Sequence, residues 1–217
     1  MIFIEISILV TKPEHDSTTY YLSKWFEPNI RLIEEKGIKL SKLEKRNANR
    51  KNFESYLKNN SYSAIFLNGH GSDKVIGGHN DEELLIAGEN EHLLKSKIIY
   101  AISCKSGSIL GPNCINKGAI SYTGYSKEFI FECDNKMYSR PLKDKLAKLY
   151  LEPAQSFVQH LIKGCSVGES TNKIKEGFYK NIYDLLSTAS KDNIWTVKLL
   201  WWNQKHLITH GDTNATL

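Results

Sequence analysis

SAIFLNGHG at residues 63–71 and KIIYAISCKSG at residues 97–107 are the stretches that decide the fold. Each is a short apolar run that ends in a chemically reactive side chain, His70 in the first and Cys104 in the second. Short apolar runs bounded by glycine and other small residues predict buried strands of a parallel sheet. In such a sheet, groups just beyond the carboxyl ends of neighbouring strands meet in one crevice. The sequence therefore predicts that an imidazole and a thiol meet there as a base and a nucleophile.

The rest of the chain alternates predicted strands with predicted helices. Strands are expected at Ile2–Val10, Ile38–Leu43, Ala64–Leu67, Ile98–Ser103 and Ala119–Thr123, with a small hairpin of Lys74–Ile76 and Leu84–Ile86 beyond His70. Helices are expected at Thr18–Lys36, capped by Ser17 or Thr18, and at Asn52–Asn59, Ser108–Asn116, Leu142–Lys163 and Val167–Leu186. This alternation predicts a three-layer α/β/α sandwich with a mostly parallel central sheet, formed by residues 1–217 as a single domain.

The C-terminal part of the chain is expected to complete the sheet. Ile194–Trp202 is rich in residues that favour strands, and Lys205–Thr209 either pairs with it or closes the sheet. This assignment favours burial of Trp195, Trp201 and Trp202 in a terminal strand over a role as an exposed binding platform.

Composition limits the class of protein. The chain has 217 residues, a net charge of +5 and a sequence pI near 8.8, so it is only mildly basic. Its basic clusters, Lys42–Lys51 and Lys143–Lys148, alternate charges as solvated helix faces do, so no nucleic-acid partner is predicted. The four cysteines have neither disulfide nor metal-ligand spacing and indicate reduced thiols in the cytoplasm. Met1–Val10 indicates a buried strand rather than a signal peptide, and no run approaches the ~20 residues that span a membrane, so no membrane partner is expected.

The residues around the two strand ends resemble those of the caspase-like cysteine peptidases, the superfamily of caspases, metacaspases, gingipains, separases and bacterial CHAT domains. The similarity rests on Gly69-His70-Gly71 after one strand and on Ala101-Ile102-Ser103-Cys104 at the end of the other. Lys105-Ser106-Gly107 follows the cysteine here, instead of the Arg/Gln-Gly of caspases. Gly118–Gly124 and Leu207–Asp212 look similar to segments of CHAT and gingipain-type domains, so the resemblance is closest to the bacterial branches.

The resemblance implies a cysteine endopeptidase that cleaves a protein substrate and needs no cofactor. His70 and Cys104 match the catalytic dyad, and Gly71 matches the residue whose backbone N–H forms an oxyanion hole with that of Cys104. A nearby imidazole and a helix start at Gly107–Ser108 are expected to lower the pKa of the thiol. The sequence identifies no third residue that orients His70. Control is expected from a regulatory protein partner, or from the polar loop Phe131–Pro141 covering the site.

Two other functions remain open at this point. The same fold could serve as a catalytically silent protein-binding module, or a flavodoxin-like domain could bind a small ligand and carry the histidine and cysteine by coincidence. His70, His79 and His92 have no metal-ligand spacing, so no metal site is predicted. The substrate pocket stays unassigned, although its walls are expected within Gly124–Arg140.

Overall fold

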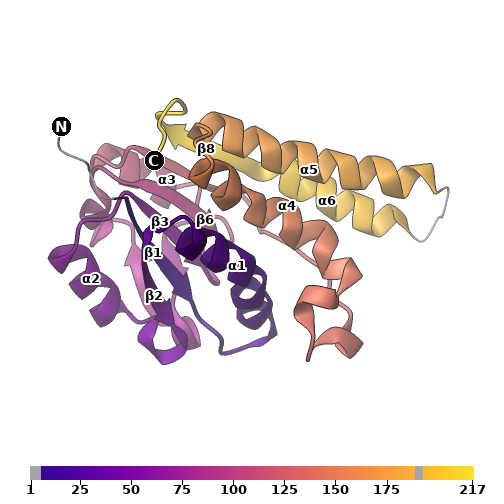
Figure 1. Ribbon diagram of the computed structural model, residues 1–217, viewed down its shortest axis with the longest axis horizontal. Helices are drawn as coiled ribbons and strands as arrows, with labels where there is room; N and C mark the ends of the chain where they lie inside the picture. The colour runs from indigo at the N-terminus through magenta and orange to yellow at the C-terminus, as the bar shows by residue number, and fades with distance from the viewer. Residues whose placement is uncertain (1–5, 189–192) are drawn as a thin grey trace.

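Figure 1 shows the computed structural model, which describes residues 6–188 and 193–217. Its centre is a six-stranded sheet with the order β2-β1-β3-β6-β7-β8. The strands are β1 (Ser7–Lys12), β2 (Lys39–Glu44), β3 (Ala64–Asn68), β6 (Ile98–Ile102), β7 (Ser121–Tyr125) and β8 (Leu207–Gly211). The first five run parallel, and β8 pairs antiparallel with β7. A separate antiparallel hairpin of β4 (Val75–Gly77) and β5 (Glu83–Ile86) follows β3.

Helices cover both faces of the sheet. They are α1 (Ser17–Glu35), α2 (Arg50–Asn59), α3 (Leu110–Asn116), α4 (Lys145–Ile162), α5 (Val167–Ser187) and α6 (Ile194–His206). Successive strand residues face opposite sides, so Val10 joins the core beneath α1, α4 and α5, whereas Leu9 joins the core beneath α2 and α3. α5 packs against both α4 and α6 (Figure 1). The predicted α/β/α sandwich with a mostly parallel sheet is confirmed.

Most predicted elements lie close to their expected positions. β1 covers Ser7–Lys12, and residues 2–5 of its predicted range lie outside the described residues. α3 begins at Leu110 rather than Ser108, with Pro112 in its first turn, where a missing N–H costs no hydrogen bond. None of the described helices is both long and apolar enough to cross a membrane.

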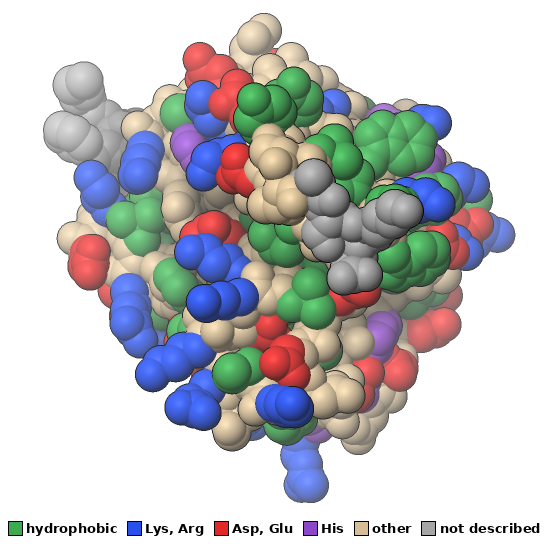
Figure 2. Space-filling view, turned by 90° about the vertical axis from the view of Figure 1, so that its right-hand side faces the viewer, with side chains coloured by type: hydrophobic (Ala, Val, Ile, Leu, Met, Phe, Trp, Pro, Cys, Tyr) green, Lys and Arg blue, Asp and Glu red, His purple; other side chains and the backbone are tan. Residues whose placement is uncertain are grey.

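The prediction of a strand at Ile194–Trp202 is wrong. The segment belongs to α6, which turns Leu200 and Asn203 inward and packs against α5. Trp195 and Trp201 are 61% and 49% exposed, so their predicted burial is wrong too. Strand propensity describes how side chains fit a half-buried sheet, and here the partner surface is a helix instead. Figure 2 faces the end of the α5–α6 pair and shows hydrophobic side chains gathered on it.

One contact between α4 and α5 compensates for a proline in the helix interior. Pro153 lies within α4 and cannot donate a hydrogen bond to the carbonyl of Leu149, one turn earlier. The side-chain amide of Asn181, on α5, donates to that carbonyl at 2.8 Å. α4 therefore continues through the proline, and the Leu149 carbonyl still has a hydrogen-bond partner, supplied by α5.

Candidate active site

His70 and Cys104 follow neighbouring parallel strands, as the sequence predicts. In the β3–β6 register, Asn68 lies opposite Ile102, and each candidate residue comes two positions later. The backbone N–H of Gly69 donates to the Ile102 carbonyl at 3.3 Å, so the pairing continues past the end of the strands. Both residues therefore emerge at the same carboxyl edge of the sheet, from adjacent positions.

The two strand-end loops pack directly on each other. The Ser103 hydroxyl donates to the His70 carbonyl at 3.0 Å. A Cβ atom on Gly71 would lie 2.1 Å from the Ser103 hydroxyl oxygen and 3.3 Å from the carbonyl oxygen of Cys104. No side chain fits at position 71, because the glycine backbone there runs against the cysteine loop.

The backbone N–H groups of Gly71 and Cys104 remain available. Gly71 forms an isolated antiparallel bridge with Ile76, flanked by hydrogen bonds from Gly77 N to His70 O (2.9 Å) and from Ser72 N to Val75 O (2.8 Å). In such a non-hydrogen-bonded pair, the N–H of the central residue points away from its partner strand. Neither of the two N–H groups donates to any residue that the structure describes.

The ring of His70 is held by Asp16, a residue that the sequence analysis missed. Nε2 of His70 lies 2.6 Å from Oδ2 of Asp16. Asp16 also caps α1, a place predicted for Ser17 or Thr18, and accepts hydrogen bonds from the Thr19 backbone (2.8 Å) and hydroxyl (2.7 Å). Partial burial favours the neutral acid, but the bonds from Thr19 and His70 prevail and lower the pKa of Asp16 to about 2.

A signal for Asp16 was present in the sequence. Asp16 follows β1, which pairs parallel with β3, so it emerges at the same edge of the sheet as His70. The strand-end rule that identified His70 and Cys104 applies equally to this third strand.

The thiol of Cys104 is more buried than expected. Sγ donates to the carbonyl of Phe129 at 3.8 Å. Burial raises the pKa of the thiol, Glu128 acts in the same direction, and Lys105 opposes them. The predicted lowering of this pKa is therefore wrong for the free protein. One reason is that α3 begins six residues after the cysteine, and a left-handed residue, Lys105 at φ +57°, lies in the turn between them.

The wall beside Cys104 is formed by residues 127–130 and held by α6. The side-chain amide of Asn203 donates to Ile130 O (2.6 Å) and accepts from Ile130 N (3.0 Å). Trp202 Nε1 donates to Glu128 O at 2.9 Å. Lys105 N donates to the carbonyl of Lys127 at 3.0 Å, which ties the cysteine loop to the same wall. The helix predicted as a strand therefore supports the site.

A hollow of about 290 Å³ lies beside His70. It is lined by His70, Gly71, Ser72, Val75, Gly77, Asp81 and Glu83. The lining contains two carboxylates and no lysine or arginine. The hollow opens beside the hairpin β4–β5, at the rim of the site.

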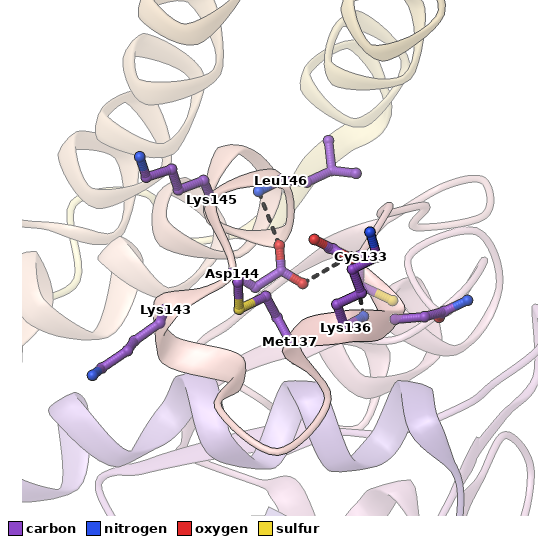
Figure 3. Close-up of a pocket in the computed structure, with 9 residues that line it drawn as sticks. Cys133, Lys136, Met137, Lys143, Asp144, Lys145 and Leu146 are labelled. Carbon is purple, nitrogen blue, oxygen red and sulfur yellow. Dashed lines mark hydrogen bonds between the residues drawn. The ribbon is translucent and has the colours of Figure 1, made fainter.

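A second hollow, of about 760 Å³, lies where the loop Phe131–Pro141 meets the start of α4 (Figure 3). Asp144 lies at its centre and accepts from Asp134 N (2.8 Å) and Leu146 N (2.9 Å). Its lining contains Met137 but neither His70 nor Cys104. Phe131 packs beside Tyr21 of α1, with ring centroids 6.0 Å apart. The loop predicted to cover the site is thus anchored on α1 and α4.

Comparisons with known proteins show what this fold resembles. The chain is similar to the crystal structure of the Arg-specific cysteine proteinase gingipain R (RGPB), with a TM-score of 0.65 and 11% identity over 98% of this chain. It is also similar to a complex of Porphyromonas gingivalis RgpB pro- and mature domains, with a TM-score of 0.62 and 11% identity. The match covers 47% and 48% of those chains, so this chain spans about half their length. No family model matches, and no curated protein matches by sequence.

Proposed function

We propose that this chain is a cysteine-type endopeptidase whose catalytic dyad is His70 and Cys104. The observation that carries the proposal is their emergence from register-paired positions of adjacent strands, in a fold similar to that of a cysteine proteinase. A nucleophile and a base placed at one sheet edge are the parts that acyl transfer requires.

Each residue has a defined role in the proposed reaction. The Cys104 sulfur forms a bond to the carbonyl carbon of the peptide, and its proton passes to His70. His70 then donates that proton to the departing amine, and a water molecule hydrolyses the thioester. Asp16 orients the imidazole and stabilises its protonated form, as its 2.6 Å contact with Nε2 allows.

The free N–H groups of Gly71 and Cys104 support an oxyanion hole. Both are without a protein acceptor among the described residues, and the glycine backbone runs against the cysteine loop. Donors aimed at the developing oxyanion lower the barrier by about 3–4 kcal/mol each in well-studied cases.

A protein partner is part of the proposal. The raised pKa of Cys104 keeps the thiol protonated at neutral pH, so the free chain is expected to be a weak nucleophile. One of the similar structures is a complex of a pro-domain with a mature domain. By analogy, we propose that another protein segment restrains or activates the site of this chain.

The alternative of a catalytically silent binding module is favoured by one observation. The Cys104 thiol donates to the Phe129 carbonyl, and burial raises its pKa, which favours the thiol over the thiolate. The flavodoxin-like alternative gains nothing comparable, because the hollow next to His70 has an acidic lining unsuited to phosphates.

A peptide-based thiol-reactive probe followed by mass spectrometry tests the proposal. Stoichiometric labelling at Cys104 that requires His70 is the expected result, with His70→Ala losing the label. Cys165→Ala, which removes another partly exposed thiol, is the matched control and should label normally. Labelling that is equal at Cys104 and Cys165, or independent of His70, would leave a binding module as the better reading. Cleavage of a diverse peptide library would then identify the residue before the cut.

A further inference from the structure

Two histidines and a carboxylate meet at the rim of the proposed active site. His15 comes from the loop between β1 and α1, His70 from the loop after β3, and Asp81 from the loop between β4 and β5. One ligand atom from each lies within 4.8 Å of the other two. The sequence analysis missed this cluster, because its members are far apart in the chain and have no metal-motif spacing.

The spacing within the cluster suits a small metal ion. Nε2 of His15 lies 3.2 Å from Oδ1 of Asp81. In a tetrahedral zinc site, ligand atoms about 2.0–2.2 Å from the metal lie roughly 3.3 Å from one another. This pair already has that separation, and a ring nitrogen of His70 lies within 4.8 Å of a ligand atom of each.

His15 is held in a largely buried position beside Asp81 and His79. The His15 side chain is 10% exposed, and its Nδ1 has no hydrogen-bond partner among the described residues. The ring of His79 stacks edge-on against His15 at 5.5 Å, and its Nδ1 is buried and also without such a partner. These nitrogens do not mark the ion, because the atom of His15 that lies beside Asp81 is Nε2; they show that an ion on Nε2 breaks no other hydrogen bond of the His15 ring.

The three loops are held in place by their backbones. His15 N donates to the Thr19 hydroxyl at 3.1 Å, at the start of α1. The His70 carbonyl accepts from both Ser103 and Gly77. Asp81 has a left-handed backbone at φ +57°, a conformation that aspartate tolerates better than most residues. Ligands from loops fixed in this way lose little freedom when they bind an ion.

We propose that His15, His70 and Asp81 bind one divalent transition-metal ion of the zinc class. Imidazole ligands favour zinc and its neighbours over magnesium or calcium, which prefer oxygen alone. Three protein ligands leave one position for water. This inference rests on the proposed function. An ion coordinated by His70 blocks the imidazole that accepts the Cys104 proton, so metal binding switches the peptidase off reversibly. Removal of the ion by a chelator restores it.

Direct binding to the full chain, after treatment with a chelator, tests the site without any assay of activity. Calorimetric titration with Zn²⁺ is expected to give one ion per chain. His15→Gln and Asp81→Asn should each weaken binding by at least about tenfold. Even replacing a residue that only hydrogen-bonds to a metal ligand usually lowers metal affinity by about that much. The matched controls are His92→Gln and Glu35→Gln, both exposed and outside the lining of the hollow beside His70, which should bind as the wild type does. Unchanged affinity in both test variants overturns the site, and circular dichroism checks that each variant is folded.

Cobalt spectroscopy separates this site from binding at thiols. Co²⁺ should give ligand-field bands typical of nitrogen and oxygen ligands, and the same bands should appear in Cys104→Ala. A sulfur-to-cobalt charge-transfer band that disappears in Cys104→Ala overturns the assignment of the ligands. Zn²⁺ binding as described, with probe labelling of Cys104 unaffected by the ion, confirms the site and contradicts the proposed role of His70 instead.

Discussion

Asp16 connects the start of a helix to the candidate active site. Its carboxylate caps α1 by accepting a hydrogen bond from the Thr19 N–H. The same carboxylate contacts Nε2 of His70 at 2.6 Å. The same side chain therefore contributes to folding stability and orients the proposed catalytic base. These two contributions can be separated, because asparagine is as good a helix cap as aspartate but carries no charge.

Replacement of Asp16 should reveal both roles. Asp16→Ala should lower the free energy of unfolding by about 1 kcal/mol, the usual cost of a lost cap, and should reduce probe labelling of Cys104. Asp16→Asn should keep nearly all of the stability and still lose labelling, because the imidazolium loses its carboxylate. Denaturant unfolding and mass spectrometry measure the two effects. Full labelling in a folded Asp16→Asn variant would contradict an orienting role for the carboxylate.

The sequence predicted the sheet and the positions of His70 and Cys104 at strand ends because both depend on local sequence patterns. The apolar runs at β3 and β6 each end at a reactive residue, and parallel pairing brings their ends together without further information. The role expected of Gly71 came instead from the resemblance to caspase-like peptidases, and the close approach of the Ser103 hydroxyl explains why a glycine stands there.

Other features were not predictable, since they depend on tertiary contacts. The assignment at Ile194–Trp202 failed because packing against α5, not intrinsic propensity, decides its structure. The raised pKa of Cys104 follows from burial beside residues 127–130, which are held by that same helix. His15 and Asp81 are 66 positions apart, and only the fold brings them together.

The charge pair next to Cys104 should control the reactivity of the thiol. Glu128 raises the pKa of Cys104 and Lys105 lowers it, while the two side chains pair with each other at 2.7 Å. Glu128→Gln removes the negative charge and leaves the lysine, so the pKa should fall and the thiolate fraction at a given pH should rise. The pH profile of iodoacetamide alkylation measures this, and the variant's profile should shift to lower pH.

Wild-type Cys104 should reach half of its maximal alkylation rate at a pH above the usual range for a free cysteine. Glu35→Gln, an exposed carboxylate on α1, is the control and should leave the profile in place. If the wild-type thiol is instead alkylated rapidly at neutral pH, the burial seen here does not govern its reactivity.

Asn203 should be essential for the order of the wall beside Cys104. It is fully buried and makes two hydrogen bonds to the Ile130 backbone. Asn203→Ala leaves the N–H and carbonyl of Ile130 unpaired, which should cost about 1–3 kcal/mol per buried group. Hydrogen exchange should become faster at residues 127–131, and the thermal midpoint should fall. The exposed Trp201→Ala on the same helix is the control, and an equal change in exchange there would point to general loosening of α6.

Asn181 should matter only because Pro153 is present. Its amide donates at 2.8 Å to the Leu149 carbonyl, which the proline cannot serve. Asn181→Ala should therefore destabilise the protein by about 1 kcal/mol through the unpaired carbonyl. In a Pro153→Ala background, the new backbone N–H at position 153 can reach that carbonyl, so the same replacement should cost much less. A double-mutant cycle of unfolding free energies measures the difference, because contacting residues are not additive. Equal costs in the two backgrounds would show that Asn181 stabilises the α4–α5 contact by some means other than the free carbonyl.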